Sequence, residues 1–206
     1  MRLEALDAET IALIRLAGVI ASSSETDVRA EFAKCAGFVP AEWVEELVVQ
    51  SYLFSGFPRA LNAAREWRRV APLPAPATDE GDDVTHVDEW RQRGEATCAE
   101  VYGGMYAKLR VNIRQLHPAL DGAMVVEGYG KILGRPGLDL PRRELCIVAA
   151  CATTGQDRQL HSHLHGSLNV GVTPEVLAAA VRSLEPLLGT ERTRSVQLLL
   201  GRVVGK

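Results

Sequence analysis

The chain has 206 residues, of which 47% are hydrophobic and 24% charged, and its formal net charge is −3. These values are typical of a globular protein with a sizeable core, organised as one large domain or two small ones. The charge pattern has no basic block, which argues against nucleic acid as a partner. No apolar run approaches the roughly 20 residues that cross a bilayer, and the N-terminus lacks a signal-peptide core. We therefore expect a cytoplasmic protein that binds neither nucleic acid nor membrane.

Helix signals dominate the first 70 residues. Asp7 is a candidate N-cap, Gly37 follows a second helical pattern, and Pro40 and Pro58 suit the start of a helix. These signals predict helices over residues 8–21, 25–35, 40–54 and 58–70.

The middle of the chain begins with a proline-rich and then acidic segment, residues 71–88, which we interpret as a linker or surface loop. A helical pattern follows over residues 89–116, weakened by Gly103 and Gly104, and another over residues 119–133. The last quarter predicts helices over 139–154, 157–169, from 174 to a break at Pro186 and Gly189, and from 190 to about 204. No segment alternates with period two, so the expected fold is all-α.

The last quarter repeats the order of helix signals seen at the start. Gly37 and Gly171 are 134 residues apart (171 − 37), and Pro40 and Pro174 have the same spacing. This offset predicts a duplication: residues 1–70 form a degenerate N-terminal repeat, 71–88 a linker, and 89–206 a second repeat with lead-in helices.

A glutamate and a histidine flank the turn at Gly155. Glu144 lies 11 residues before this glycine and His163 lies 8 after it, so the two differ by roughly one helical turn in height along an antiparallel hairpin. A carboxylate close to an imidazole fixes its tautomer and raises its basicity, which suits proton transfer near neutral pH. The structural alternatives are an ordinary acid in a first turn for Glu144 and a satisfied core histidine for His163.

Two more histidines, His161 and His165, are four residues apart and share a helix face, a spacing that can bind a metal. No third ligand is obvious, so we expect no metal site. The alternatives are polar rim residues or cations for an anionic ligand. The four cysteines form no C-x-x-C pair and are expected to be buried, reduced thiols.

The segment RPGLDLPRREL and the later HLHGSLNVGVTPE resemble the carboxymuconolactone decarboxylase family, which has the alkylhydroperoxidase D-like fold. The resemblance covers about forty residues. It implies an all-α helical bundle with two related helical repeats and a buried site between helices. The family's glutamate falls on Glu144 and its histidine on His163. In the first repeat the matching positions are Thr10 and Arg29, so that half carries no catalytic pair.

The resemblance also implies an activity and an assembly. It points to a cofactor-independent lyase of the kind used in aromatic-compound degradation, acting on a small-molecule carboxylate or lactone, with no metal. His163 is the implied acid or base and Glu144 its orienter. A homo-oligomer, trimer or hexamer, is implied. The C-x-x-C of the peroxidase branch is replaced by Gln156 and Gln159, which argues against hydroperoxide reduction.

Candidate substrate-binding residues surround this pair. Arg135 and Arg143 are expected to clamp carboxylates, because a guanidinium binds a carboxylate in two places at once. Their alternatives are bonds to loop carbonyls for Arg135 and a surface ion pair for Arg143. Gln159, His161 and His165 complete the set. Gln159 stands where the decarboxylases commonly have a glutamate, so a ligand-binding or structural protein, or an isomerase or lactone hydrolase acting on a related acid, stays open as an alternative.

Overall fold

The computed structural model describes residues 3, 5–71 and 73–205, and it confirms the all-α prediction. No strand occurs among these residues, and the only ladder contact is an isolated parallel bridge between Leu3 and Val172. No helix in the described ranges is long and apolar enough to cross a membrane. The chain divides into two compact units, residues 1–73 with 137–206 and residues 74–136, which are described separately.

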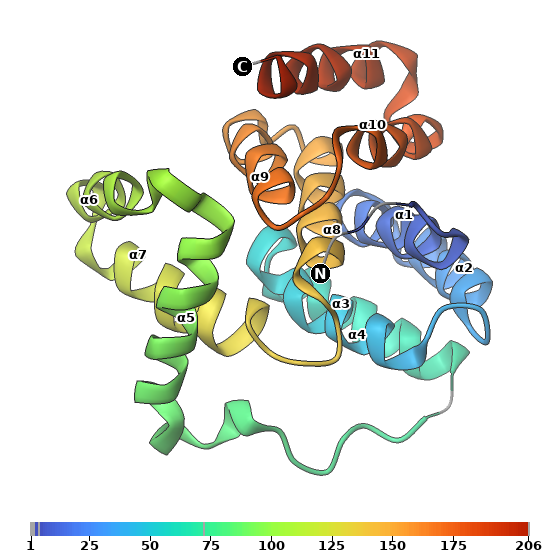
Figure 1. Ribbon diagram of the computed structural model, residues 1–206. Helices are drawn as coiled ribbons and strands as arrows, with labels where there is room; N and C mark the ends of the chain where they lie inside the picture. Colours follow the sequence, from blue (N-terminus) through green and yellow to red (C-terminus); the bar gives the residue numbers. More distant parts are fainter. Residues whose placement is uncertain (1–2, 4, 72, 206) are drawn as a thin grey trace. The chain divides into compact units, whose positions relative to one another are not determined.

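The first unit contains two sets of four helices (Figure 1). The bounds of the first set are α1 Ala8–Ser22, α2 Glu25–Cys35, α3 Ala41–Ser55 and α4 Phe57–Val70. Those of the second set are α8 Leu140–Thr153, α9 Asp157–Asn169, α10 Pro174–Ser183 and α11 Glu185–Val204. The predicted break near the C-terminus is confirmed, because the backbone leaves the helical conformation at Gly189, within the range given for α11.

Helix α8 is the core of this unit, since every residue from Pro141 to Ala152 is buried. It packs against α1, α3 and α9. Its start follows from the sequence: the Asp139 side chain accepts a hydrogen bond from the Arg142 amide, and Pro141 lies in the first turn, where its missing N–H costs nothing. An apolar helix with a strong cap is therefore fixed in the centre of the fold.

The second unit comprises α5 Val87–Tyr102, α6 Tyr106–Leu116, α7 Pro118–Ala123 and η4 Met124–Leu133, which is a π-helix. Three short 3₁₀ turns, η1 Glu80–Asp82, η2 Val84–His86 and η3 Gly103–Met105, precede and join these helices. The pattern predicted as one helix over 89–116 is therefore two helices. They separate at Gly103, whose φ of 51° is unfavourable for other residues.

Equivalent glycines support the proposed duplication within the first unit. Gly37 and Gly171 end α2 and α9 with φ values of 74° and 95°. Gly56 precedes α4 with φ 84° and ψ 153°, and Gly189 has nearly the same conformation, φ 74° and ψ 163°. This region of φ/ψ space is essentially restricted to glycine, so both halves use the same backbone device.

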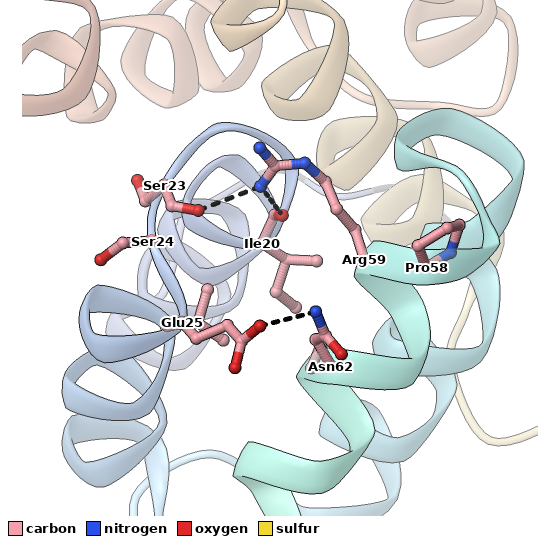
Figure 2. A pocket seen from close by; sticks show the side chains of 9 residues that line it. Ile20, Ser23, Ser24, Glu25, Pro58, Arg59 and Asn62 are labelled. Carbon is pink, nitrogen blue, oxygen red and sulfur yellow. Dashed lines mark hydrogen bonds between the residues drawn. The ribbon is translucent and has the colours of Figure 1, made fainter.

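Equivalent arginines follow three residues after the last two of these glycines. Arg59 donates from Nη1 to the carbonyl oxygens of Ile20, at 3.3 Å, and Ser23, at 3.0 Å, at the end of α1 (Figure 2). Arg192 donates from Nε to the carbonyl oxygen of Ala152, at 3.1 Å, near the end of α8. Each half thus uses an arginine to satisfy terminal carbonyls of its first helix. The spacing of these pairs is 133 residues (189 − 56 and 192 − 59), one fewer than that of Gly37 and Gly171.

Candidate functional site

The structure brings Glu144 and His163 together inside the first unit. The Nδ1 atom of His163 on α9 lies 2.8 Å from Oε2 of Glu144 on α8. Glu144 is completely buried, and 2% of the His163 surface is exposed to solvent. Gly155, with φ 71°, makes the turn between α8 and α9 that sets the two helices side by side. An acid and an imidazole therefore share a hydrogen bond in the core, where burial strengthens the interaction.

The second oxygen of the Glu144 carboxylate has no hydrogen-bond partner among the described residues. This Oε1 atom is fully buried. Buried carboxylate oxygens are normally satisfied, because desolvation without a compensating hydrogen bond is costly. An unmatched acceptor beside a titratable imidazole is more typical of a site that receives a ligand than of a purely structural pair.

Helix α3 forms a third wall against this pair. Its Phe54 ring meets the His163 ring edge-on, with centroids 5.4 Å apart and planes at 88°. One turn earlier, Gln50 donates to the carbonyl oxygen of Arg143 at 3.3 Å and accepts from its guanidinium at 3.2 Å. One further turn earlier, Glu46 accepts from Arg143 Nη2 at 2.7 Å. These three residues were not among the site residues predicted from the sequence, although their four-residue spacing places them on one helix face.

Arg143 is completely buried, so the surface ion pair considered for it is not what the structure shows. Besides its contacts with α3, the guanidinium donates from Nε to the carbonyl oxygen of Leu138 at 3.0 Å. Its bonds tie the start of α8 to α3 and to the preceding loop. The adjacent Arg142 is also engaged: it donates to Thr10 Oγ1 at 2.8 Å and to Asp7 at 2.9 Å.

The first-half positions that match the pair have other partners. Thr10 accepts the hydrogen bond from Arg142. Arg29 is a surface residue that forms an ion pair with the buried carboxylate of Glu66 on α4. These contacts are structural, as expected for a half without a catalytic pair.

The other predicted binding residues occupy varied surroundings. Arg135 belongs to the second unit, where it makes a bidentate ion pair with Asp79 at 3.0 and 2.6 Å. Gln159 is exposed on α9. His161 and His165 are half-buried, with ring centroids 4.8 Å apart. Within the described ranges, no group of three or more His, Cys, Asp or Glu side chains is arranged to hold a metal ion.

The sequence profile of the carboxymuconolactone decarboxylase family matches residues 122–200, which include both members of the buried pair.

A curated relative, "Peroxisomal protein 2" of Schizosaccharomyces pombe, is 30% identical over 139 residues. The aligned residues make up 66% of this chain and 64% of that protein, so the match spans less than two thirds of the relative.

The match to this family makes the cysteines relevant, because the C-x-x-C pair of the peroxidase branch has no counterpart in this sequence. All four are buried thiols rather than disulfides. Burial raises the pKa of the Cys151 thiol to about 12, with a smaller contribution from the Glu144 carboxylate, and burial also raises the pKa of Cys35 to about 12. These thiols are protonated near neutral pH and are poor nucleophiles. Gln156 and Gln159, both exposed, stand where the redox pair of the peroxidases stands.

A cavity of about 330 Å³ lies elsewhere in the first unit, between the end of α1, the start of α2 and α4 (Figure 2). Its lining includes Arg59, Glu25 and Asn62, and Asn62 donates to Glu25 at 2.7 Å. Neither Glu144 nor His163 contributes to this lining. The volume of a cavity alone does not indicate chemistry, so we place the candidate site at the buried pair, where titratable groups converge.

Proposed function

We propose that this protein is a cofactor-independent lyase, similar to carboxymuconolactone decarboxylases, that acts on a cyclic unsaturated carboxylic acid or lactone. The observation that carries the proposal is the 2.8 Å hydrogen bond between the buried His163 and Glu144. The family match over residues 122–200 supports it, because it covers both residues.

The geometry assigns a role to each atom of the pair. With Nδ1 of His163 bonded to Glu144, Nε2 is the ring nitrogen that exchanges a proton with the substrate. Glu144 holds the tautomer with a proton on Nδ1 and stabilises the imidazolium that forms when Nε2 accepts one. The carboxylate acts through the ring, so Glu144 is the positioning residue and His163 the acid or base.

The reaction is balanced without a redox partner. The bond between the ring carbon and the substrate carboxylate breaks, and its electron pair moves into the unsaturated lactone as carbon dioxide leaves. In the imidazolium form, with a proton on each ring nitrogen, His163 gives its Nε2 proton to that carbon. The neutral imidazole that results regains the Nε2 proton from solvent. The protein contributes orientation, a water-poor environment and the proton.

Recognition of the substrate's acidic groups requires cations or polar donors. The buried Arg143 guanidinium is engaged by Glu46, Gln50 and Leu138, so we assign it to holding the site rather than to clamping substrate. The half-buried His161 and His165 stay in the proposal as candidate residues for an anionic group, together with Gln159. The Arg135 guanidinium is engaged by Asp79 in the second unit, so we assign it to that unit rather than to substrate.

We also propose a homo-oligomer, a trimer or hexamer, and a cytoplasmic location. Exposed apolar side chains support the oligomer, among them Leu116 and Val84, which are 78% and 76% exposed. Light scattering on the purified protein measures the number of subunits, and a monomer at micromolar concentration would contradict this part of the proposal.

The test is a screen of unsaturated lactones and dicarboxylic acids that follows carbon dioxide release, with the wild type, His163→Ala and Glu144→Gln. Loss of a general acid or base lowers turnover by about 10²- to 10⁴-fold, and we expect His163→Ala to fall in that range. His86→Ala, at a half-buried histidine of the second unit, is the control.

Three outcomes contradict the proposal in different ways. Full turnover by His163→Ala shows that the Glu144–His163 pair is not catalytic. Conversion without carbon dioxide release indicates an isomerase or lactone hydrolase instead. Binding without conversion of any compound in the screen indicates a non-catalytic member of the fold. Circular dichroism of each variant separates these results from loss of folding.

A further inference from the structure

Helices α3 and α10 have equivalent places in the two halves of the first unit. Pro40 precedes α3 and Pro174 begins α10, at the same 134-residue spacing as Gly37 and Gly171. Helix α3 packs against α8, the first helix of the second half, and α10 packs against α1, the first helix of the first half. Comparing the two halves therefore shows whether polar residues are required where these helices pack.

The face of α3 toward α8 and α9 is polar and aromatic. Gln50 is only 2% exposed and Glu46 only 8%, yet both make hydrogen bonds to Arg143. Phe54, one turn further along, contacts the ring of His163. Burying polar side chains is costly unless each finds a partner, so a polar column in a helix interface calls for a reason beyond packing.

The matching positions in the second half are apolar. The 134-residue spacing matches Glu46 with Ala180 on α10 and Gln50 with Leu184, the C-cap residue that follows α10. Ala180 and Leu184 are 1% and 0% exposed, so hydrocarbon side chains fill these two buried positions. The architecture does not require polar residues at this position, and they occur only in the half that faces the Glu144–His163 pair.

We propose that Gln50, together with Glu46 and Phe54, positions the Glu144–His163 pair, so that the degenerate first half completes the site of the second half. Gln50 bonds both the guanidinium and the carbonyl oxygen of Arg143, and that carbonyl belongs to the peptide unit joining Arg143 to Glu144. Phe54 limits rotation of the His163 ring from the other side. This inference rests on the proposed function for its catalytic meaning, but its structural content is independent of any substrate.

The structural test is NMR of protein with ¹⁵N-labelled histidine, with the His163 resonances assigned by their loss in His163→Ala. Gln50→Met keeps side-chain volume and removes the hydrogen bonds, and Phe54→Leu removes the ring. Both variants are expected to shift the ¹⁵N frequencies of the His163 ring, because its surroundings change. Glu42→Gln, at an exposed position of the same helix, is the control and leaves these frequencies unchanged.

The activity test uses the same variants on a substrate found in the screen. A misplaced pair lowers kcat by about tenfold or more with little change in KM. Unchanged His163 resonances in both folded variants overturn the inference and leave the proposed function standing. Shifted resonances in a protein that converts no substrate support the positioning but count against the proposed function. Should Gln50→Met unfold, Phe54→Leu alone decides the question.

Discussion

Arg143 and Glu144 are adjacent in the sequence, are both completely buried, and have entirely different side-chain partners. Arg143 reaches α3, where Glu46 and Gln50 receive its guanidinium, whereas Glu144 reaches α9 and bonds His163. The first turn of α8 therefore joins three helices through two neighbouring charged residues. Buried charged groups are tolerated when they are paired and hydrogen-bonded, and here each supports an arrangement that hydrocarbon side chains would not specify.

Removal of the Arg143 guanidinium should be strongly destabilising. In Arg143→Met the Glu46 carboxylate stays in the interface without its partner, and the loss of one member of a buried ion pair costs about 3–5 kcal/mol. Urea unfolding followed by circular dichroism measures this. The double variant Arg143→Met with Glu46→Leu should recover part of the loss, since no unpaired charge remains. A double variant that is less stable than the single one would show that the pair itself is not the cause.

The Glu144–His163 hydrogen bond gives a second stability prediction. Glu144→Leu leaves the His163 Nδ1–H without its acceptor, which costs about 1–3 kcal/mol in the unfolding free energy. Glu144→Gln keeps a carbonyl oxygen in place and should cost less. Denaturant midpoints of the two variants provide the comparison. Equal stabilities would mean that the hydrogen bond contributes little to the fold.

The second unit should lose stability in acid because of Asp121. Hydrogen bonds from the Arg110 guanidinium hold the pKa of this buried carboxyl below its ordinary value of 3.8. A depressed pKa in the folded state means that the stabilisation is fully present above pH 3.8 and is lost as the pH falls through the lower folded pKa.

Asp121→Asn tests this dependence. It should lower stability at neutral pH and flatten the acid dependence, as followed by the denaturant midpoint between pH 7 and pH 2. Asp88→Asn is the control, because that side chain is 80% exposed. An acid dependence that Asp121→Asn leaves intact must come from other carboxylates.

Glycine substitutions should separate backbone strain from packing. Alanine at Gly56 or Gly189 meets a positive φ, and forcing such a conformation costs about 1–3 kcal/mol. At neither position would an added Cβ crowd another atom closer than 3.9 Å, so the effect is conformational. Gly104→Ala is the control, since it has open space and no positive φ. Melting temperatures should fall for the first two variants and hold or rise for the third.

The sequence predicted most of the helices and the hydrogen-bonded pair because these depend on local signals. Asp139 and Pro141 fix where α8 begins, and Gly155 fixes where the chain turns, so the heights of Glu144 and His163 along the hairpin follow from counting residues. The sequence indicated only a weakened helix at Gly103, where the positive φ of this glycine divides the pattern into two helices. The π-helix over Met124–Leu133 was not predicted.

The sequence by itself determined the all-α class, the hairpin and the residues that meet across it. Only the tertiary structure decided that Arg143 is buried rather than on the surface, and that α3, about ninety residues earlier, supplies Gln50 and Phe54 to the same site. Contacts within a hairpin are set by helix periodicity and a short turn. Contacts between distant helices depend on which faces pack together, and a single sequence carries no local signal for that choice.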